Sequence, residues 1–342
     1  MSSSFRWWPL GPGLVRACCG GGWGAALAAA VILVLAQGLM LAVLFGAQDH
    51  QLAQQRSEQM RNVGLSLGAA LDNAGRFALA QAEVQVRRDD VLDAMAREDR
   101  AALAHLTQAS YDYLKGQAGV NIFGFHSKDI RYLLRMHSPR NFNDDISGFR
   151  QMVVAANRSR HYQVGLEMGR AGIGVRGVSV LARGEQFLGT FEVGMDVQPL
   201  IESVKAVTNA EIAVLVSPQM SGVPVGQELE GRRFGDVVMM ATTDERRFAT
   251  LLREQGLDMA GETRFGEYRA DQRHYTVMTQ PLVDFSGRMI GSIAILKDFA
   301  ELKSGIKQTR TELWVVALCT GMMAFALLRV VLLGAAPSRD TA

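Results

Sequence analysis

The chain has 342 residues, and its 36 lysines and arginines nearly balance its 34 aspartates and glutamates, which gives a formal net charge of +2. This balance offers no electrostatic case for binding nucleic acid, which requires a strongly basic surface. The three cysteines, Cys18, Cys19 and Cys319, lie in or beside two apolar segments, so the residues between these segments can form no disulfide framework.

Two apolar runs, residues 23–47 and 313–333, are each long enough to cross a bilayer, which takes about 20 helical residues. Gln37 is the only strongly polar residue of the first run, and Arg329 interrupts the second run near its end. A cleaved signal peptide is the alternative for the first run, but its apolar part is too long and Phe45 disrupts the small-residue cleavage pattern. We therefore expect two transmembrane helices in a lipid bilayer.

Charged residues around the first run predict the orientation of the chain. Arg6 and Arg16 precede the run, whereas Asp49 and His50 follow it. The positive-inside rule then places both termini in the cytoplasm and the long intervening loop outside. Residues 334–342 are too few for a kinase or cyclase module, so we expect a separate output protein to receive any signal.

A long helical spine is predicted for residues 48–119. Apolar residues recur there at three- and four-residue intervals: Met60, Val63, Leu67, Leu71, Ala74 and Ala78. This pattern predicts one helix from Gln48 to about Arg88, and a second pattern predicts another from about Arg88 to Gln117. The first helix could form the seam of a homodimer through residues 48–88, or it could simply cover its own domain.

Beyond Gly119 the hydrophobic period changes from that of a helix to that of strands. Residues 120–127 and 129–138 read as two strands joined by a turn, and residues 146–159 as a helix capped by Asp144 or Asp145. The strand-like segment LGTFEVGMD, residues 188–196, has a partner in IGSIAILKD, residues 290–298, with equal spacing from glycine to aspartate. This internal repeat predicts an α+β fold with two similar antiparallel modules.

The order of these elements, together with the segments LRMHSP, NDDISGFR, GLEMGRAGIGVRGV and LGTFEVG, resembles the double Cache sensor domains of bacterial chemoreceptors, histidine kinases and cyclases. The resemblance covers about Gln48 to Arg310. It implies two PAS-like antiparallel modules behind a long amino-terminal helix, in a two-pass protein of the bacterial inner membrane whose large loop is periplasmic. It also implies that a small molecule binds in the module distal to the membrane. The usual cytoplasmic linker and output module are missing from this pattern.

We therefore expect the following organisation. Residues 1–22 are cytoplasmic, 23–47 form transmembrane helix 1, 48–119 the helical spine, 120–209 the membrane-distal module, 210–299 the membrane-proximal module, 300–312 a connecting helix, 313–333 transmembrane helix 2 and 334–342 a cytoplasmic tail.

Ionisable side chains concentrate in the unrepeated part of the first module, between Arg131 and Arg176. The candidate ligand-binding residues are Arg135, His137, Arg150, Glu167, Arg170 and Arg176. Arg135 and His137 alternate with apolar residues, so both are expected on one face of a strand. Guanidinium groups hold carboxylates in bidentate fashion, which favours a small organic anion as the ligand. Glu167 or Asp145 could instead hold an amine, and a structural salt-bridge network is the third alternative.

Other motifs in this region carry no catalytic chemistry. The glycines of Gly172–Gly177 match a dinucleotide fingerprint, but a strand-like run follows them where a helix is required, so a tight bend explains them better. His126, His137, Asp144 and Asp145 fit no compact metal-ligand spacing. We therefore expect no cofactor, no metal and no enzymatic activity.

The leading hypothesis is a membrane-anchored extracytoplasmic sensor that binds a small solute and signals through its transmembrane helices to a separate cytoplasmic or membrane partner. Two alternatives remain open: a structural or assembly subunit that uses this fold for protein contacts, and a truncated chemoreceptor or kinase without its output module.

Overall fold

The computed structural model describes residues 22–169, 172–223, 227–254, 257, 259, 261–270 and 273–334. The chain divides into two compact units. One unit is Arg56–Phe299, and the other joins the residues up to Gln55 to those from Ala300 onward.

Helix α2 (Gly22–Val86) is continuous through the predicted span and the predicted spine. Its apolar stripe is buried within the chain: Met60, Val63, Leu67, Ala74 and Ala78 are all nearly inaccessible to solvent. The stripe therefore covers the helix's own domain, as one of the two sequence alternatives predicts. A homodimer through α2 would have to use another face, where Leu65 and Val84 are 71% and 57% exposed.

The helix predicted from Arg88 to Gln117 is in fact two helices, α3 (Asp89–Ala96) and α4 (Arg100–Ala118). The chain breaks between them because Glu98 adopts a left-handed conformation with a φ of 51°. The Asp99 side chain then accepts a hydrogen bond from the Ala102 amide and begins α4 as its N-cap. Local capping thus overrides the helical spacing of the apolar residues.

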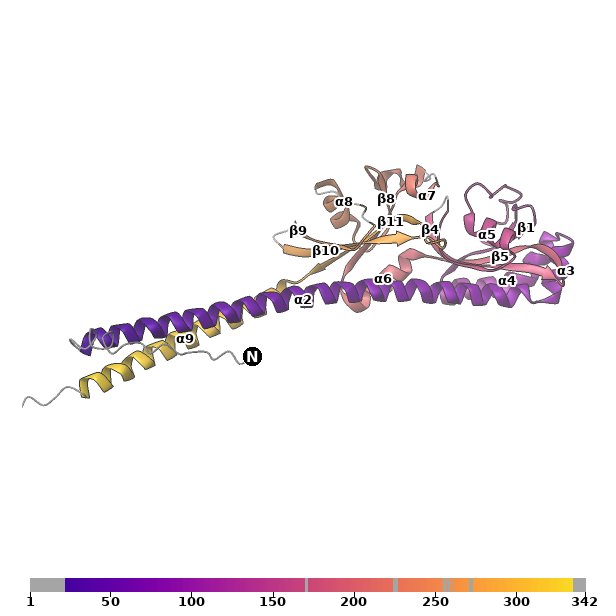
Figure 1. Ribbon diagram of the computed structural model, residues 1–342. Coiled ribbons are helices and arrows are strands. Elements are labelled where there is room, and N and C mark those ends of the chain that lie inside the picture. The colour runs from indigo at the N-terminus through magenta and orange to yellow at the C-terminus, as the bar shows by residue number, and fades with distance from the viewer. Residues whose placement is uncertain are drawn as a thin grey trace, which may run out of the picture. The chain divides into compact units, whose positions relative to one another are not determined.

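The first sheet has five antiparallel strands in the order β2-β1-β5-β4-β3. Its strands are β1 (Val120–Ser127), β2 (Tyr132–Arg135), β3 (Gln163–Gly169), β4 (Gly172–Arg183) and β5 (Gln186–Asp196). Gly177 of β4 faces α2 so closely that a Cβ there would lie 2.3 Å from the Leu79 nitrogen. Because successive strand residues alternate, Val178 points to the other face, where it packs with residues of helix α5 (Gln151–Ser159). Figure 1 shows α3 and α4 beside this sheet.

The second sheet has the order β7-β8-β6-β11-β10-β9 and is also antiparallel. Its strands are β6 (Glu211–Val216), β7 (Arg233–Phe234), β8 (Val237–Thr242), β9 (Arg264–Ala270), β10 (Arg273–Val283) and β11 (Met289–Asp298). The accompanying helices are α6 (Val197–Thr208), α7 (Pro218–Ser221), the 3-10 helix η1 (Gln227–Arg232) and α8 (Glu245–Glu254). The order β8-β6-β11-β10-β9 repeats the order of the first sheet, so the predicted α+β fold with two similar antiparallel sheets is confirmed.

The strand registers show which residues of the first sheet correspond to which residues of the second sheet. Arg176 pairs with Gly194 in the first sheet, and Val277 pairs with Leu296 at the corresponding place in the second. A bulge follows at Leu181/Ala182 in β4 and at Leu282/Val283 in β10. Residues of the first-sheet strands, such as Arg176, therefore have defined counterparts in the second sheet.

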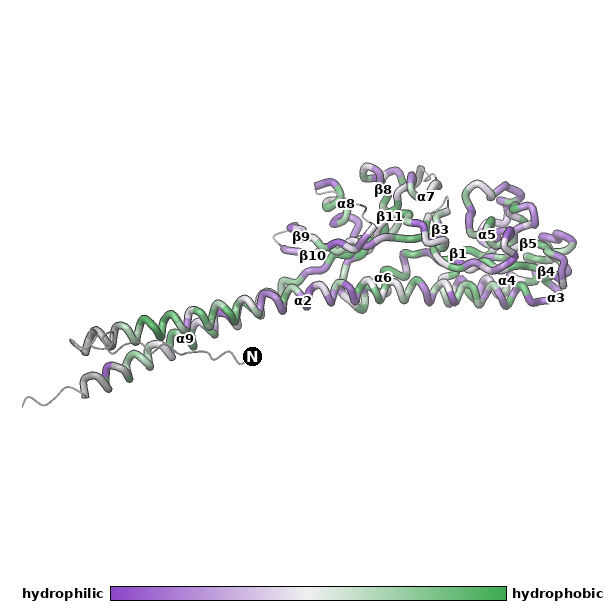
Figure 2. Tube along the Cα trace, viewed as in Figure 1, coloured by the Kyte–Doolittle hydropathy of each residue, from purple (hydrophilic) through white to green (hydrophobic). Residues whose placement is uncertain are grey.

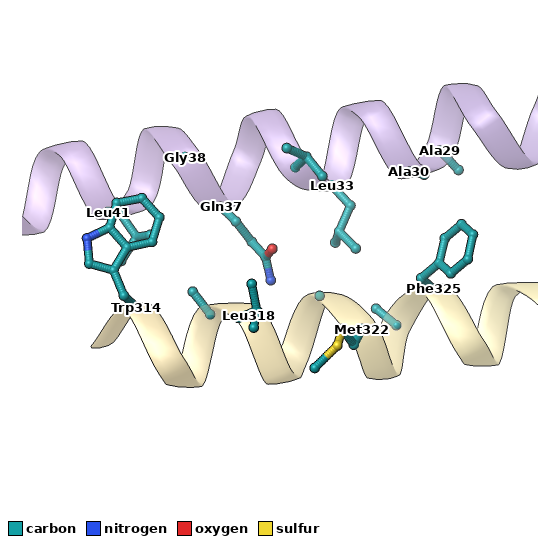
Figure 3. A pocket seen from close by; sticks show the side chains of 14 residues that line it. Ala29, Ala30, Leu33, Gln37, Gly38, Leu41, Trp314, Leu318, Met322 and Phe325 are labelled. Atoms are coloured by element: carbon teal, nitrogen blue, oxygen red, sulfur yellow. The ribbon is translucent and has the colours of Figure 1, made fainter. Parts of the chain in front are cut away.

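The other unit pairs the amino-terminal part of α2 with helix α9 (Ala300–Gly334). Both helices are long and apolar enough to cross a membrane, and Figure 2 shows the hydrophobic residues along them. Gln37 Nε2 donates to Thr320 Oγ1 over 3.1 Å between the two helices. Figure 3 shows Gln37 directed from α2 toward α9 within an apolar groove of about 540 Å³.

At one end of this groove, charged and aromatic side chains join the two helices. Arg310 lies 2.6 Å from Asp49, and the rings of Phe45 and Trp314 are 5.9 Å apart. An ion pair beside aromatic rings is typical of the interface between a bilayer and water.

Candidate functional site

A cavity of about 190 Å³ lies on the face of the first sheet that α5 covers. Its lining residues are Ile122, Tyr132, Arg135, His137, Asp144, Phe149, Arg150, Gly169 and Arg176. Four of the six candidate residues from the sequence are thus brought together. Glu167 lies behind the cavity in contact with two of its arginines, and Arg170 lies outside the described residues.

His137 and Arg150 reach the cavity from elements whose bounds differ from those predicted from the sequence. The strand predicted for residues 129–138 is shorter, because β2 ends at Arg135 and the chain then turns, with the Ser138 amide donating to the Arg135 carbonyl. His137 therefore lies in the turn and not on the strand face. The helix predicted from residue 146 begins only at Gln151, because the Asp145 side chain accepts from the Ser147 amide and holds a local turn.

Arg150 is the centre of a buried charge cluster. Its Nε lies 2.8 Å from Glu167 Oε2, and its two terminal nitrogens donate to the carboxylate of Glu192, one of them over 3.1 Å. All three side chains are at most 5% exposed. Burial alone would lower the pKa of Arg150, but Glu167 and Glu192 outweigh it and hold the pKa well above its usual range.

Glu167 also connects the cluster to α5. Its Oε1 accepts a hydrogen bond of 2.7 Å from the Met152 amide, in the first turn of the helix. The N-cap residue of α5, Arg150, makes no side-chain cap of its own. Glu167 from strand β3 therefore supplies the negative charge and the acceptor that a helix amino terminus needs.

Arg176 is the least satisfied member of the cluster. Its side chain is only 7% exposed, yet its closest carboxylate contacts are 3.6 Å to Glu167 and 3.5 Å to Glu192. Its Nε has no hydrogen-bond partner among the described residues. Burial and the neighbouring Arg150 both lower its pKa. A buried guanidinium that lines a cavity and has an unpartnered Nε among the described residues is chemically suited to bind an anion.

Glu192 also contacts two uncharged partners. The Tyr132 hydroxyl donates a short hydrogen bond to Glu192 Oε1, and His126 Nε2 lies 3.4 Å from the same oxygen. The other ring nitrogen of His126 is 3.0 Å from the Thr190 hydroxyl. Burial raises the pKa of Glu192, but Arg150 and His126 outweigh it and hold that pKa well below its ordinary value. Burial lowers the pKa of His126 in spite of the nearby carboxylate.

A polar loop closes one side of the cavity. Arg135 holds Asp144 in a bidentate ion pair, with distances of 2.6 and 2.8 Å, and its guanidinium stacks 3.6 Å above the Tyr132 ring. Arg100 donates to the backbone carbonyls of Leu133 and Pro139. These arginines fix residues 136–144 over the cavity.

Sequence reasoning missed three members of the cluster: His126, Tyr132 and Glu192. Glu192 lies in the repeated stretch LGTFEVGMD, where the other copy has Ala294, so the difference between the two copies was the available signal. The expected tight bend at Gly172–Gly177 is wrong, because these residues lie within β4. Among the described residues, no group of three histidine, cysteine or acidic side chains could hold a metal.

The second sheet shows that the fold itself does not require these charges. The strand registers align His126, Tyr132, Glu167, Arg176 and Glu192 with Leu215, Met239, Tyr268, Val277 and Ala294. All five counterparts belong to one hydrophobic core under α8. Replacing a buried ionic network by a well-packed apolar core is often neutral or stabilising, so stability alone does not account for the charges in the first sheet.

Comparison with solved structures gives matches at low sequence identity. The periplasmic domain of Vibrio cholerae LuxQ is 13% identical, covering 69% of this chain and 98% of that chain with a TM-score of 0.42. The sensor domain of the V. cholerae histidine kinase DctB is 10% identical, with 73% and 98% covered and a TM-score of 0.46. The ligand-binding domain of the Campylobacter jejuni chemoreceptor Tlp3, in complex with L-valine, is 10% identical, with 72% and 92% covered and a TM-score of 0.44.

A search of curated proteins finds no match. A family model described as "Double sensory domain of two-component sensor kinase" matches residues 53–302, most of the chain and both sheets. The chain therefore belongs to this double Cache family of sensory domains.

Proposed function

We propose that the cavity of the first sheet binds a small organic anion, with a carboxylate as its head group. The observation that carries this proposal is Arg176, whose buried guanidinium lines the cavity without a hydrogen-bond partner for its Nε among the described residues. Arg135 and Arg150 line the same cavity, while Glu167 and Glu192 are not among its lining residues. The lining thus carries three arginines and one carboxylate, that of Asp144, which pairs with Arg135, while Glu167 and Glu192 hold Arg150 and Arg176 from outside the lining.

The volume of the cavity limits the size of the anion. At about 190 Å³ it is smaller than the 300–1,000 Å³ typical of sites for drug-sized ligands. Ile122 and Phe149 provide an apolar wall beside the arginines. A compact carboxylate with a short apolar part therefore fits better than a nucleotide or a sugar phosphate.

The proposal assigns the two apolar helices to signal output. Strand β11 ends at Asp298 and α9 begins at Ala300, so one intervening residue connects the second sheet to a candidate membrane helix. In this proposal the two sheets lie on the periplasmic side of the inner membrane, the chain crosses it twice, and ligand binding displaces α9 toward a separate output protein. A ligand can do so only if its affinity differs between two conformations.

The test is a thermal-shift and calorimetric titration of the purified full chain with short mono- and dicarboxylates, neutral and zwitterionic amino acids, amines and inorganic phosphate. At least one carboxylate should bind, and Arg176→Met should weaken its binding by about tenfold or more, since charge-assisted pairs contribute well over 1 kcal/mol. Arg158→Met, at an exposed arginine of α5, is the matched control. Binding of amines alone, or of no small molecule but a co-purifying protein, would overturn the anion proposal.

A further inference from the structure

The turn between β10 and β11 of the second sheet contacts the edge of the first sheet. The Phe285 amide donates a hydrogen bond of 2.9 Å to the Leu166 carbonyl of β3. The adjacent Gly165 has a φ of 142°, and a Cβ there would lie 3.1 Å from Phe285 Cα. The turn thus lies directly against the backbone of β3, which is the outermost strand of its sheet.

The Phe285 ring supports the wall of the cavity. It packs against a buried hydrophobic cluster that includes Tyr132 and Val178, and Phe149 packs against the same cluster. Tyr132 and Phe149 both line the cavity. A residue of the second sheet therefore touches the same cluster as the residues that a ligand would contact.

Hydrogen bonds of Asp284 and Arg288 hold the turn in one conformation. The Asp284 carboxylate, which is 8% exposed, accepts hydrogen bonds from the Ser286 amide and hydroxyl and from the Arg288 amide and guanidinium. Arg288 donates in turn to the Ser221 carbonyl. These contacts fix the turn to the ends of β10 and β11.

The equivalent turn of the first sheet makes no such backbone contact with another sheet in the part of the chain that the structure describes. It joins β4 to β5, and Arg183, Gly184, Glu185 and Gln186 are exposed. Arg183 pairs with Asp93 at the surface. Since both sheets have the same strand order, a docked turn is not a requirement of the fold.

We propose that Phe285 is a positioning residue that couples the cavity to strand β11. Leu166, which accepts its hydrogen bond, directly precedes Glu167, whose carboxylate contacts Arg150 and Arg176. A ligand that pulls the arginines away from Glu167 moves this segment of β3 and the cluster of Tyr132 and Val178 beside it. The Phe285 ring, which packs against that cluster, passes the movement to the turn and to β11, and the backbone hydrogen bond to Leu166, which Phe285→Ala keeps, is not sufficient by itself. This inference concerns the regulation of the proposed site and rests on the proposed function.

The experiment measures hydrogen–deuterium exchange of the full chain in lipid nanodiscs. Because the ligand is not identified, a substitution in the charged cluster of Arg150, Glu167, Arg176 and Glu192 perturbs the site in its place. Glu167→Gln, and separately Arg176→Met, should change the exchange rate of peptides from β11 by about threefold or more, as expected for interacting neighbours. The same substitutions should leave β11 exchange unchanged when combined with Phe285→Ala. Phe285→Leu, which keeps an apolar side chain against the cluster, should restore the response. Glu185→Ala, in the equivalent exposed turn, should not affect it.

The outcomes separate coupling from a merely structural role. If β11 responds equally with and without Phe285→Ala, or if neither pocket substitution affects β11, the proposal is overturned. It is also overturned if Phe285→Ala abolishes the response of β3 and α5, because Phe285 would then be only a part of the cavity's fold. This experiment perturbs the site by substitution and uses no ligand, so its result is independent of the titration with carboxylates. If no carboxylate binds, the proposed function is wrong, and the exchange experiment still decides whether Phe285 couples the site to β11.

Discussion

Glu192 on β5 and Ala294 on β11 occupy the same position in two copies of one sheet. Glu192 is fully buried and receives two hydrogen bonds from Arg150, whereas Ala294 is fully buried in a hydrophobic core. Both positions follow their glycine, Gly189 or Gly291, by three residues in the repeated segment. One strand arrangement therefore supports an ionic interior in one sheet and an apolar interior in the other, and each charged residue of the cluster that lies on a strand has an apolar counterpart within the same chain.

The first prediction replaces residues of the charged cluster in the first sheet by their apolar counterparts in the second sheet. Glu192→Ala alone should lower the free energy of unfolding by about 3–5 kcal/mol, because it leaves two buried guanidinium groups, those of Arg150 and Arg176, facing the one carboxylate of Glu167. The combined variant His126→Leu, Tyr132→Met, Arg176→Val and Glu192→Ala should unfold within about 1 kcal/mol of the natural chain or be more stable, since the pair Arg150–Glu167 remains. Chemical denaturation of both purified proteins measures the difference. A combined variant less stable than Glu192→Ala would show that the charges are needed for folding.

The second prediction is that stability falls as the pH decreases. The pKa of His126 is lower in the folded chain than its ordinary value of 6.5, so the unfolded chain binds the proton first and stability is lost as the pH falls below about 6.5. The pKa of Glu192 is also lowered, from 4.5, which adds a second loss below that pH. Each group contributes at most about 1.4 kcal/mol per pH unit.

Matched histidine variants test this pH dependence. His126→Leu, which introduces the residue of the second sheet at this position, should flatten the thermal-stability profile between about pH 7 and 5. The exposed His161→Leu should leave the profile as it is. An unchanged slope in His126→Leu would assign the loss to other groups.

The third prediction concerns the repeated glycines. A Cβ at Gly189 would lie 2.1 Å from the His126 carbonyl oxygen, and one at Gly291 would lie 2.0 Å from that of Leu215. Both contacts involve the neighbouring strand's backbone, which cannot yield as a side chain can. Gly189→Ala and Gly291→Ala should each destabilise the chain by about 3 kcal/mol or more, at or above the upper end of typical overpacking. Gly266→Ala, which meets no atom within 4 Å, should change the melting temperature very little.

The fourth prediction tests the location of the sheets. In a chain whose three cysteines are replaced by serine, Val207→Cys should react with a membrane-impermeant maleimide in intact cells, because Val207 is 87% exposed on α6. Val204→Cys, at a position 6% exposed, should stay unlabelled. Labelling of Val207→Cys only after the membrane is permeabilised would place the sheets in the cytoplasm and contradict the periplasmic assignment.

The sequence alone determined the features that depend on local pattern. Apolar runs predicted both candidate membrane helices, and the repeat of residues 188–196 in residues 290–298 predicted two similar antiparallel sheets. The glycine in each copy was a reliable signal because a neighbouring carbonyl oxygen leaves no room for a side chain. Hydrophobic period acts over a few residues, so it can be read from the chain directly, whereas the glycines were visible only because the repeat marks them.

Only the tertiary structure decided which charged residues meet. Arg150 comes from the start of α5, Glu167 from β3 and Glu192 from β5, and their contacts depend on strand order and register. Glu167 of β3 likewise accepts a hydrogen bond from the Met152 amide of α5, which the packing of this helix against the sheet brings within reach. Burial then decides the chemistry, because it makes a carboxylate–guanidinium pair costly to break.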